Sequence, residues 1–191
     1  MTERAASVTV QQSRAILVLA MDLKRFIRDI PDFPQPGILF RDITPLLREP
    51  DAFRYVIDRF TEHYRGAALD AVVAIESRGF IFGAPLAAAL GLPFVPARKP
   101  GKLPAARMSV QYALEYGTSQ LDIHEDALTR GQTVLIIDDL LATGGTARAT
   151  AKLVELLGAR VHSLAFLVEL CFLDGREALR DYQVLSLVTY E

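Results

Sequence analysis

The segment at residues 134–146, VLIIDDLLATGGT, constrains the fold of this chain more than any other stretch. Residues 134–137 are apolar and mostly β-branched, which is typical of a central parallel strand covered on both faces. Asp138 and Asp139 follow the strand, and a glycine-containing loop then leads into a helical pattern. In open α/β sheets, ligands bind at the carboxyl ends of the strands. The segment therefore predicts an α/β sheet with a ligand site at this edge.

Two adjacent acids at the end of a buried strand need particular partners. Their carboxylates repel each other, and neither can be buried unpaired without a large cost. Hydroxyl donors or a cation would compensate that cost, and a ribose with its 2′ and 3′ hydroxyls, together with Mg²⁺, supplies both. We expect Asp138 and Asp139 to accept hydrogen bonds from ribose directly or through Mg²⁺ and its waters.

The loop after the acids has the composition of a phosphate-binding loop. It contains Ala142, Thr143, Gly144, Gly145 and Thr146. Glycines let the backbone approach a ligand closely, and the helix that follows directs its N–H groups and positive dipole end at the same place. The whole string resembles the phosphoribosyl pyrophosphate (PRPP) signature of the type I phosphoribosyltransferases. A Walker A loop is excluded because no Gly-Lys-Ser/Thr follows the glycines.

Length and composition limit the domain organisation and the partners. A chain of 191 residues with 51% hydrophobic content fits one well-filled core, so we expect a single domain at residues 21–191. Residues 1–20 differ in composition and are interpreted as a dispensable extension. A net charge of −2 argues against nucleic acid as a partner, and no apolar run is long enough for a membrane span. The single cysteine fits a reducing cytoplasm.

Strand and helix patterns alternate along the chain. Apolar residues with helical spacing follow residue 51, and a buried strand is expected at 71–75. Further strands are expected at 93–97, 161–168 and 184–188, and an extended hairpin at 110–123. This alternation predicts a mainly parallel sheet flanked by helices.

Basic residues follow two of the expected strands. Arg78 comes after the strand at 71–75, and Arg98, Lys99 and Lys102 come after the strand at 93–97. Each group alone is typical of a solvated turn or loop. The expected sheet brings both groups to the same edge as the loop at 142–146. We therefore interpret these basic residues as a pyrophosphate site.

Four further segments narrow the resemblance. They are FPQPGILFRDITPLL from Phe33, AIESRGFIFGAPLA from Ala74, ARKPGKLP from Ala97 and ALEYG from Ala113, accompanied by LVEL near Val168. With the signature, they resemble the adenine phosphoribosyltransferase family from about Asp22 to the end of the chain. The resemblance implies the type I phosphoribosyltransferase fold, with an N-terminal base-binding hood and a flexible flap.

The resemblance also implies how the base is held. Leu39 and Arg41 would offer main-chain hydrogen bonds to adenine, Phe40 would stack on one face of the ring, and Leu170 would press on the other. Ordinary core packing remains the alternative for Phe40 and Leu170.

The same resemblance gives Glu115 a role in proton handling at the base, with Tyr116 nearby on the flap. Adenine must lose its N9 proton as N9 attacks C1′, while the ribosyl carbon develops positive charge. A carboxylate on a closing lid can assist both changes. The alternative is a solvated acid on the flap.

The predicted activity joins adenine to PRPP and gives AMP and pyrophosphate, with Mg²⁺ as cofactor. The resemblance further implies a homodimer, for which we expect a two-fold interface near residues 97–104. Two alternatives stay open. One is another purine phosphoribosyltransferase, such as a xanthine-type enzyme. The other is a PRPP-sensing regulator, which would need a DNA-binding module or a basic face.

Overall fold

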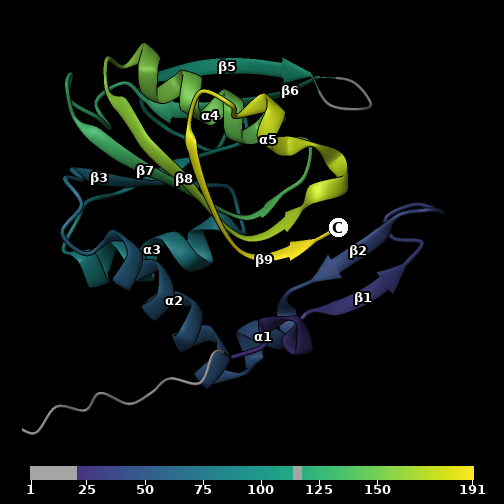
Figure 1. Cartoon of the computed structure of the whole chain (residues 1–191). Helices are drawn as coiled ribbons and strands as arrows, with labels where there is room; N and C mark the ends of the chain where they lie inside the picture. Colours follow the sequence, from purple (N-terminus) through teal and green to yellow (C-terminus); the bar gives the residue numbers. More distant parts are fainter. Residues whose placement is uncertain (1–20, 114–117) are drawn as a thin grey trace, which may run out of the picture.

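The protein is described by a computed structural model that covers residues 21–113 and 118–191. Its centre is a five-stranded sheet in the order β4-β3-β7-β8-β9, in which every neighbouring pair is parallel (Figure 1). The strands are β3 (Ala71–Ile75), β4 (Phe94–Ala97), β7 (Thr133–Leu141), β8 (Arg160–Leu170) and β9 (Gln183–Tyr190). The predicted α/β class with a mainly parallel sheet is confirmed.

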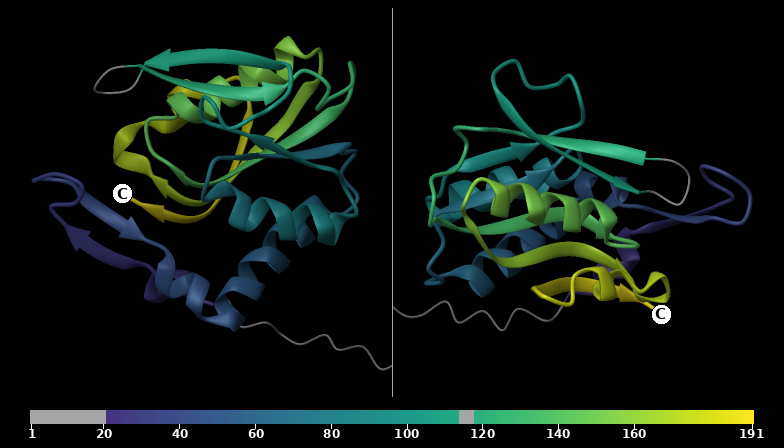
Figure 2. Two further views of the ribbon diagram at one scale, coloured as in Figure 1. Left: turned by 180° about the vertical axis from the view of Figure 1, so that it is seen from behind. Right: turned by 90° about the horizontal axis from the view of Figure 1, so that it is seen from above.

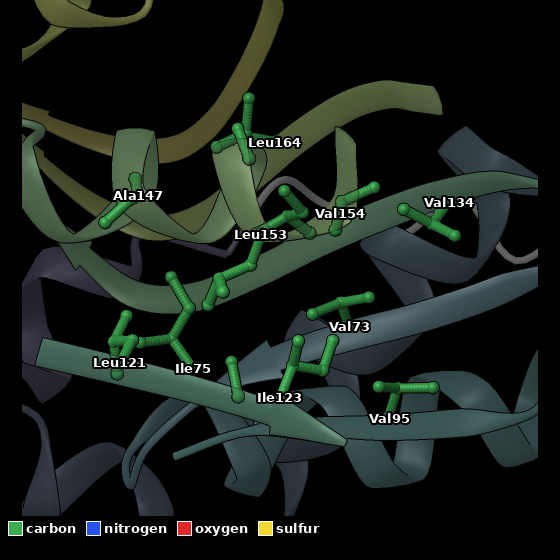
Figure 3. Close-up of a cluster of buried hydrophobic side chains, with 14 of the residues drawn as sticks. Val73, Ile75, Val95, Leu121, Ile123, Val134, Ala147, Leu153, Val154 and Leu164 are labelled. Carbon is green, nitrogen blue, oxygen red and sulfur yellow. The ribbon is translucent and has the colours of Figure 1, made fainter. Parts of the chain in front are cut away.

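Helices cover both faces of this sheet. The elements are α1 (Thr44–Arg48), α2 (Pro50–Tyr64), α3 (Gly79–Leu90), α4 (Gly145–Leu156), the short helix η2 (Cys171–Leu173) and α5 (Gly175–Ala178). Alternate strand residues enter two separate cores, because successive side chains point to opposite faces. Val73 and Val134 pack with Leu153 of α4, as Figure 3 shows. Val72 and Leu135 pack on the other face, which α2 and α3 cover.

An antiparallel hairpin lies on the α4 side of the sheet. It consists of β5 (Arg107–Ala113) and β6 (Thr118–His124), and Leu121 and Ile123 of β6 are fully buried (Figures 2 and 3). The hairpin expected from the sequence is therefore present, and its base is part of the core. Residues 114–117, which include Glu115 and Tyr116, lie outside the described residues.

The N-terminal part forms a small ribbon apart from the central sheet. A short helix, η1 (Leu23–Phe26), precedes β1 (Arg28–Pro31) and β2 (Leu39–Asp42), which pair antiparallel with each other. Figure 1 shows this ribbon projecting past the end of β9. We call residues 28–42 the hood, because they correspond to the base-binding hood expected from the sequence.

Strand order creates a crevice between β3 and β7. The chain leaves β3 through α3 to β4 on one side, and β7 later pairs with β3 on the other side. Such a switch point opens a crevice at the carboxyl ends of the two strands. β7 pairs with β3 only as far as Ile137, but with β8 as far as Leu141. The strand therefore runs past Ile137, where the sequence pattern placed its end, and includes Asp138 and Asp139.

In the described parts of the chain, no helix combines the length and the apolar character needed to span a bilayer.

Candidate active site

A cavity of about 490 Å³ opens at this switch point. Its walls come from the turn after β3, the loop after β4, the end of β7 with its following loop, and the distal part of the β5–β6 hairpin around Tyr112 and Ser119. The lining residues expected from the sequence are Arg78, Lys99, Asp138, Asp139, Ala142, Thr143, Gly144, Gly145 and Thr146. One cavity thus collects the acids, the glycine loop and two of the predicted cations.

The two acids lie next to each other with few compensating donors. Asp139 is 3% exposed, and its backbone N–H donates to Asp138 Oδ1 at 2.9 Å. Burial raises the pKa of Asp138 well above its ordinary value, and repulsion from Asp139 raises it further. Burial also raises the pKa of Asp139, although the Arg78 guanidinium opposes that shift. A hydroxyl donor or a cation would therefore stabilise the charged form of this pair.

Arg78 connects the acids to the hood. Its Nε lies 2.8 Å from Asp139 Oδ2, and its guanidinium carbon lies 5.6 Å from the centre of the Phe40 ring. Despite the ion pair, Asp139 Oδ2 is buried without an aligned hydrogen bond from any residue that the structure describes. Gly79 allows the close approach of α3 to β7, since a Cβ there would lie 2.8 Å from the Ile137 carbonyl oxygen.

The loop at 142–146 is shaped for an anion. Gly144 has a φ of 81°, and α4 starts at Gly145, so the first N–H groups of a 12-residue helix face the cavity side of the loop. Thr146 Oγ1 donates to the Tyr112 hydroxyl at 3.3 Å, which links the loop to β5. The predicted phosphate loop therefore also contacts the flap hairpin.

The basic cluster after β4 is split by the structure. Lys99 lines the cavity, whereas Arg98 and Lys102 are not among the lining residues. Arg98 Nε donates to Glu76 Oε2 at 3.0 Å, and the Lys99 backbone N–H donates to the same oxygen at 2.9 Å. Burial alone would raise the pKa of Glu76, but these two donors lower it. Arg98 thus supports the turn after β3, and the Lys102 carbonyl accepts from Arg98 Nη1 at 3.4 Å.

The predicted adenine residues lie beside the cavity but do not line it. Leu39, Phe40 and Arg41 are on β2 of the hood, and Leu39 is 43% exposed. Leu170 is buried at the end of β8. The contact between Arg78 and Phe40 is the point at which the hood meets the cavity.

Several lining residues were not predicted from the sequence. Glu76 and Ser77 belong to the same turn as Arg78, and Tyr112 and Ser119 are opposite each other in the β5–β6 register. The turn position was a usable signal for Glu76 and Ser77. Tyr112 and Ser119 gave none, because a hairpin pattern does not show which face will meet a distant loop.

The acids fit a magnesium ion that is bound mainly through its substrate. In the described ranges, no group of three or more His, Cys, Asp or Glu side chains could form a complete metal cage. Mg²⁺ is commonly held by one or two carboxylates together with substrate phosphates and waters. The buried Oδ2 of Asp139, which is ion-paired with Arg78 but accepts no aligned hydrogen bond from the described residues, suits such a partial site.

Comparisons with known proteins agree with this geometry. Residues 45–183 match the phosphoribosyl transferase domain family. The adenine phosphoribosyltransferase of Acaryochloris marina is 62% identical over 170 residues, which are 89% of this chain and all of the relative, and that of Thermotoga maritima is 61% identical over 89% of this chain and 98% of the relative.

Solved structures give the same result. The adenine phosphoribosyltransferase of Thermoanaerobacter pseudethanolicus is 56% identical with a TM-score of 0.86, covering 88% of this chain and 98% of that one. The Saccharomyces cerevisiae enzyme, solved with an imino-altritol bisphosphate and adenine, is 43% identical with a TM-score of 0.82, covering 86% and 96%. The identity and coverage are high enough to assign the family. This chain belongs to the adenine phosphoribosyltransferase family.

Proposed function

We propose that the protein transfers the 5-phosphoribosyl group of PRPP to N9 of adenine, giving AMP and pyrophosphate in purine salvage. One observation carries the proposal: Asp138, Asp139, Arg78 and the loop at 142–146 line a single cavity at the switch point of the sheet. That set provides ribose acceptors, a cation and an anion loop at one place. The enzyme is a pentosyltransferase.

The donor half of the reaction follows from the lining residues. The loop at 142–146 would hold the 5′-phosphate through backbone N–H groups and the hydroxyls of Thr143 and Thr146. Asp138 and Asp139 would accept hydrogen bonds from the ribose hydroxyls, and Arg78 and Lys99 would bind the pyrophosphate. Mg²⁺, when bound, would neutralise pyrophosphate charge and so make it a better leaving group. The raised pKa of the free Asp138 would fall as these partners arrive.

The acceptor half involves the hood, β8 and the flap. We assign Leu39 and Arg41 main-chain hydrogen bonds to adenine, Phe40 a stacking role and Leu170 contact with the opposite ring face. Adenine is present in the S. cerevisiae relative, and 9-deazaadenine in a Giardia lamblia relative that is 36% identical. We assign Glu115 proton acceptance from N9 and stabilisation of the positive ribosyl carbon, with Tyr116 beside it.

Base preference gives the test of this activity. With PRPP and Mg²⁺ saturating, we expect adenine to be turned over with a kcat/KM at least about 100-fold above those of hypoxanthine, guanine and xanthine. A site that hydrogen-bonds one base edge leaves its own polar groups unpaired with the wrong base. Steady-state kinetics on the four bases measures this ratio. Preferential turnover of a 6-oxopurine would reject the assignment.

The catalytic unit is residues 21–191, and residues 1–20 are dispensable. The A. marina relative is matched along its whole length by 89% of this chain, which supports a unit of about that size. A variant that starts at Met21 should keep the kcat and both KM values of the full chain within about twofold and unfold at the same temperature, because the A. marina relative is matched over its whole length by 170 residues of this chain. Loss of folding or of activity in this variant would contradict the assignment.

The assembly is a homodimer, with residues 97–104 at or near the two-fold interface. Closed two-fold dimers are the commonest form of soluble oligomer, which supports this choice.

A further inference from the structure

The hood needs side-chain contacts to hold its position. Its two strands form a sheet of their own, and neither is hydrogen-bonded as a strand to the central sheet in the part of the chain that the structure describes. An isolated two-stranded ribbon is marginally stable in water. Whatever fixes the hood relative to β8 therefore also fixes the geometry of the proposed adenine site.

Tyr190, near the end of β9, forms a cation–π contact with the hood. The Arg41 guanidinium carbon lies 3.8 Å from the centre of the Tyr190 ring. Arg41 also forms an ion pair with Asp29 on the neighbouring strand, so its head is held by β1 as well as by the ring. The Arg41 side chain is only 12% exposed, and a cation over an aromatic face is most stabilising when water is excluded.

The position of Tyr190 in the sheet gives this contact its functional meaning. Tyr190 pairs with Leu170 in the β8–β9 register. Leu170 is one proposed wall of the adenine site, and β2 is the other. Tyr190 is on β9, beside the wall that contains Leu170, and Arg41 is on β2, which forms the other wall. The stack of Arg41 on Tyr190 thus connects the two walls of the proposed adenine site.

We propose that Tyr190 is a positioning residue for adenine: its ring holds Arg41, and thereby β2, at a fixed distance from Leu170. The proposal rests on the adenine site assigned above. Without the ring, the hood would be ordered only when the base binds, and the apparent affinity for adenine would fall by the fraction of molecules with a correctly placed hood. Among the described residues, Tyr190 does not line the cavity assigned to PRPP, so the affinity for PRPP should be kept.

The test compares Tyr190→Ala with Tyr190→Phe in the full chain. For Tyr190→Ala we expect the KM for adenine to rise about 5- to 30-fold, the scale of a largely desolvated cation–π contact. The KM for PRPP and the kcat at saturating adenine should stay within about twofold of the wild type. Tyr190→Phe keeps the ring and should keep the wild-type KM for adenine.

Lys24→Met provides the matched control. The Lys24 ammonium lies 4.9 Å from the centre of the same ring but belongs to η1, outside the hood. This variant tests whether the loss of any contact around Tyr190 is enough to raise the KM for adenine. We expect the KM for adenine to stay unchanged. A rise equal to that of Tyr190→Ala would overturn the proposal.

Two further outcomes would overturn it: an unchanged adenine KM in Tyr190→Ala, or equal rises in both KM values. If Tyr190→Ala does not fold, Arg41→Met removes the stack from the hood side and should give the same selective rise. Failure of the adenine assignment is distinguishable, because the wild-type protein itself would then not turn over adenine.

Discussion

Replacing both acids of β7, Asp138→Asn with Asp139→Asn, should lower turnover with adenine and PRPP at least about 100-fold. This is the scale of losing preorganised groups that stabilise charge in a transition state. The amides keep the size of the carboxylates but remove both charges next to Arg78, and with them the acceptors for ribose hydroxyls and the oxygens for a magnesium ion. Steady-state kcat and kcat/KM for PRPP measure the effect.

The same double variant should not be less stable than the wild type. Folding raises the pKa of both acids, so the folded protein binds protons more tightly there than the unfolded chain does. A group of this kind favours the folded state at low pH and loses that contribution as the pH rises through its folded pKa. At neutral pH the buried charges therefore cost stability, and their removal should raise the unfolding temperature or leave it unchanged.

Asp58→Asn is the control for this pair, because Asp58 is an exposed acid on α2. It should change neither turnover nor stability. Wild-type turnover in the double variant would remove Asp138 and Asp139 from the mechanism. A large loss of stability would instead attribute the lost activity to folding.

Gly175→Ala should weaken PRPP binding strongly, although Gly175 does not line the cavity. A Cβ at this position would lie 2.1 Å from the Ala142 carbonyl oxygen and 2.9 Å from the Leu141 side chain. A contact of that length with backbone cannot be accommodated without movement, so either α5 or the phosphate loop must shift.

We expect the phosphate loop to shift, because an ion pair between Arg176 and Glu169 holds α5 against β8. Arg176 donates to both Glu169 oxygens, at 2.6 and 2.7 Å, and Glu169 is 4% exposed on β8. The Arg176 hydrogen bonds lower the pKa of Glu169, so the pair is charged at neutral pH. With α5 held, the added methyl group pushes Ala142 out of place.

We expect the KM for PRPP in Gly175→Ala to rise on the order of 10- to 100-fold, because misplacing a binding loop by about 1 Å can cost that much. Overpacking should also reduce the free energy of unfolding by about 1–3 kcal/mol. Glu177→Ala, an exposed substitution on the same helix, should change neither quantity. A wild-type KM for PRPP in Gly175→Ala would show that α5 does not position the loop.

Much of the sheet was predictable because burial leaves a strong periodic signal. The strand at 71–75 was predicted with its observed bounds, and the hairpin and the strands at 161–168 and 184–188 were found with shorter limits. The end of β7 was placed too early. It continues to Leu141 because β8 still pairs with it after β3 has ended. Neighbouring strands decided that boundary, and their order cannot be read from local periodicity.

The candidate site was predictable where one short segment carries it. The acids and the loop at 142–146 are contiguous in sequence, and all of them line the cavity. The cations were harder, because residues 98–102 have no periodicity that tells which side chain faces the ligand. Lys99 reaches the cavity, whereas Arg98 bonds to Glu76, a partner 22 residues away. The contact between α5 and the phosphate loop could not be predicted, because no sequence motif marks it.

A crystal structure of the protein with AMP bound would test the central claim most directly. We predict the 5′-phosphate on the N–H groups of residues 142–146, the ribose hydroxyls at Asp138 and Asp139, and the adenine ring between Phe40 and Leu170. AMP bound elsewhere, or bound with its phosphate away from the loop that precedes α4, would contradict the account.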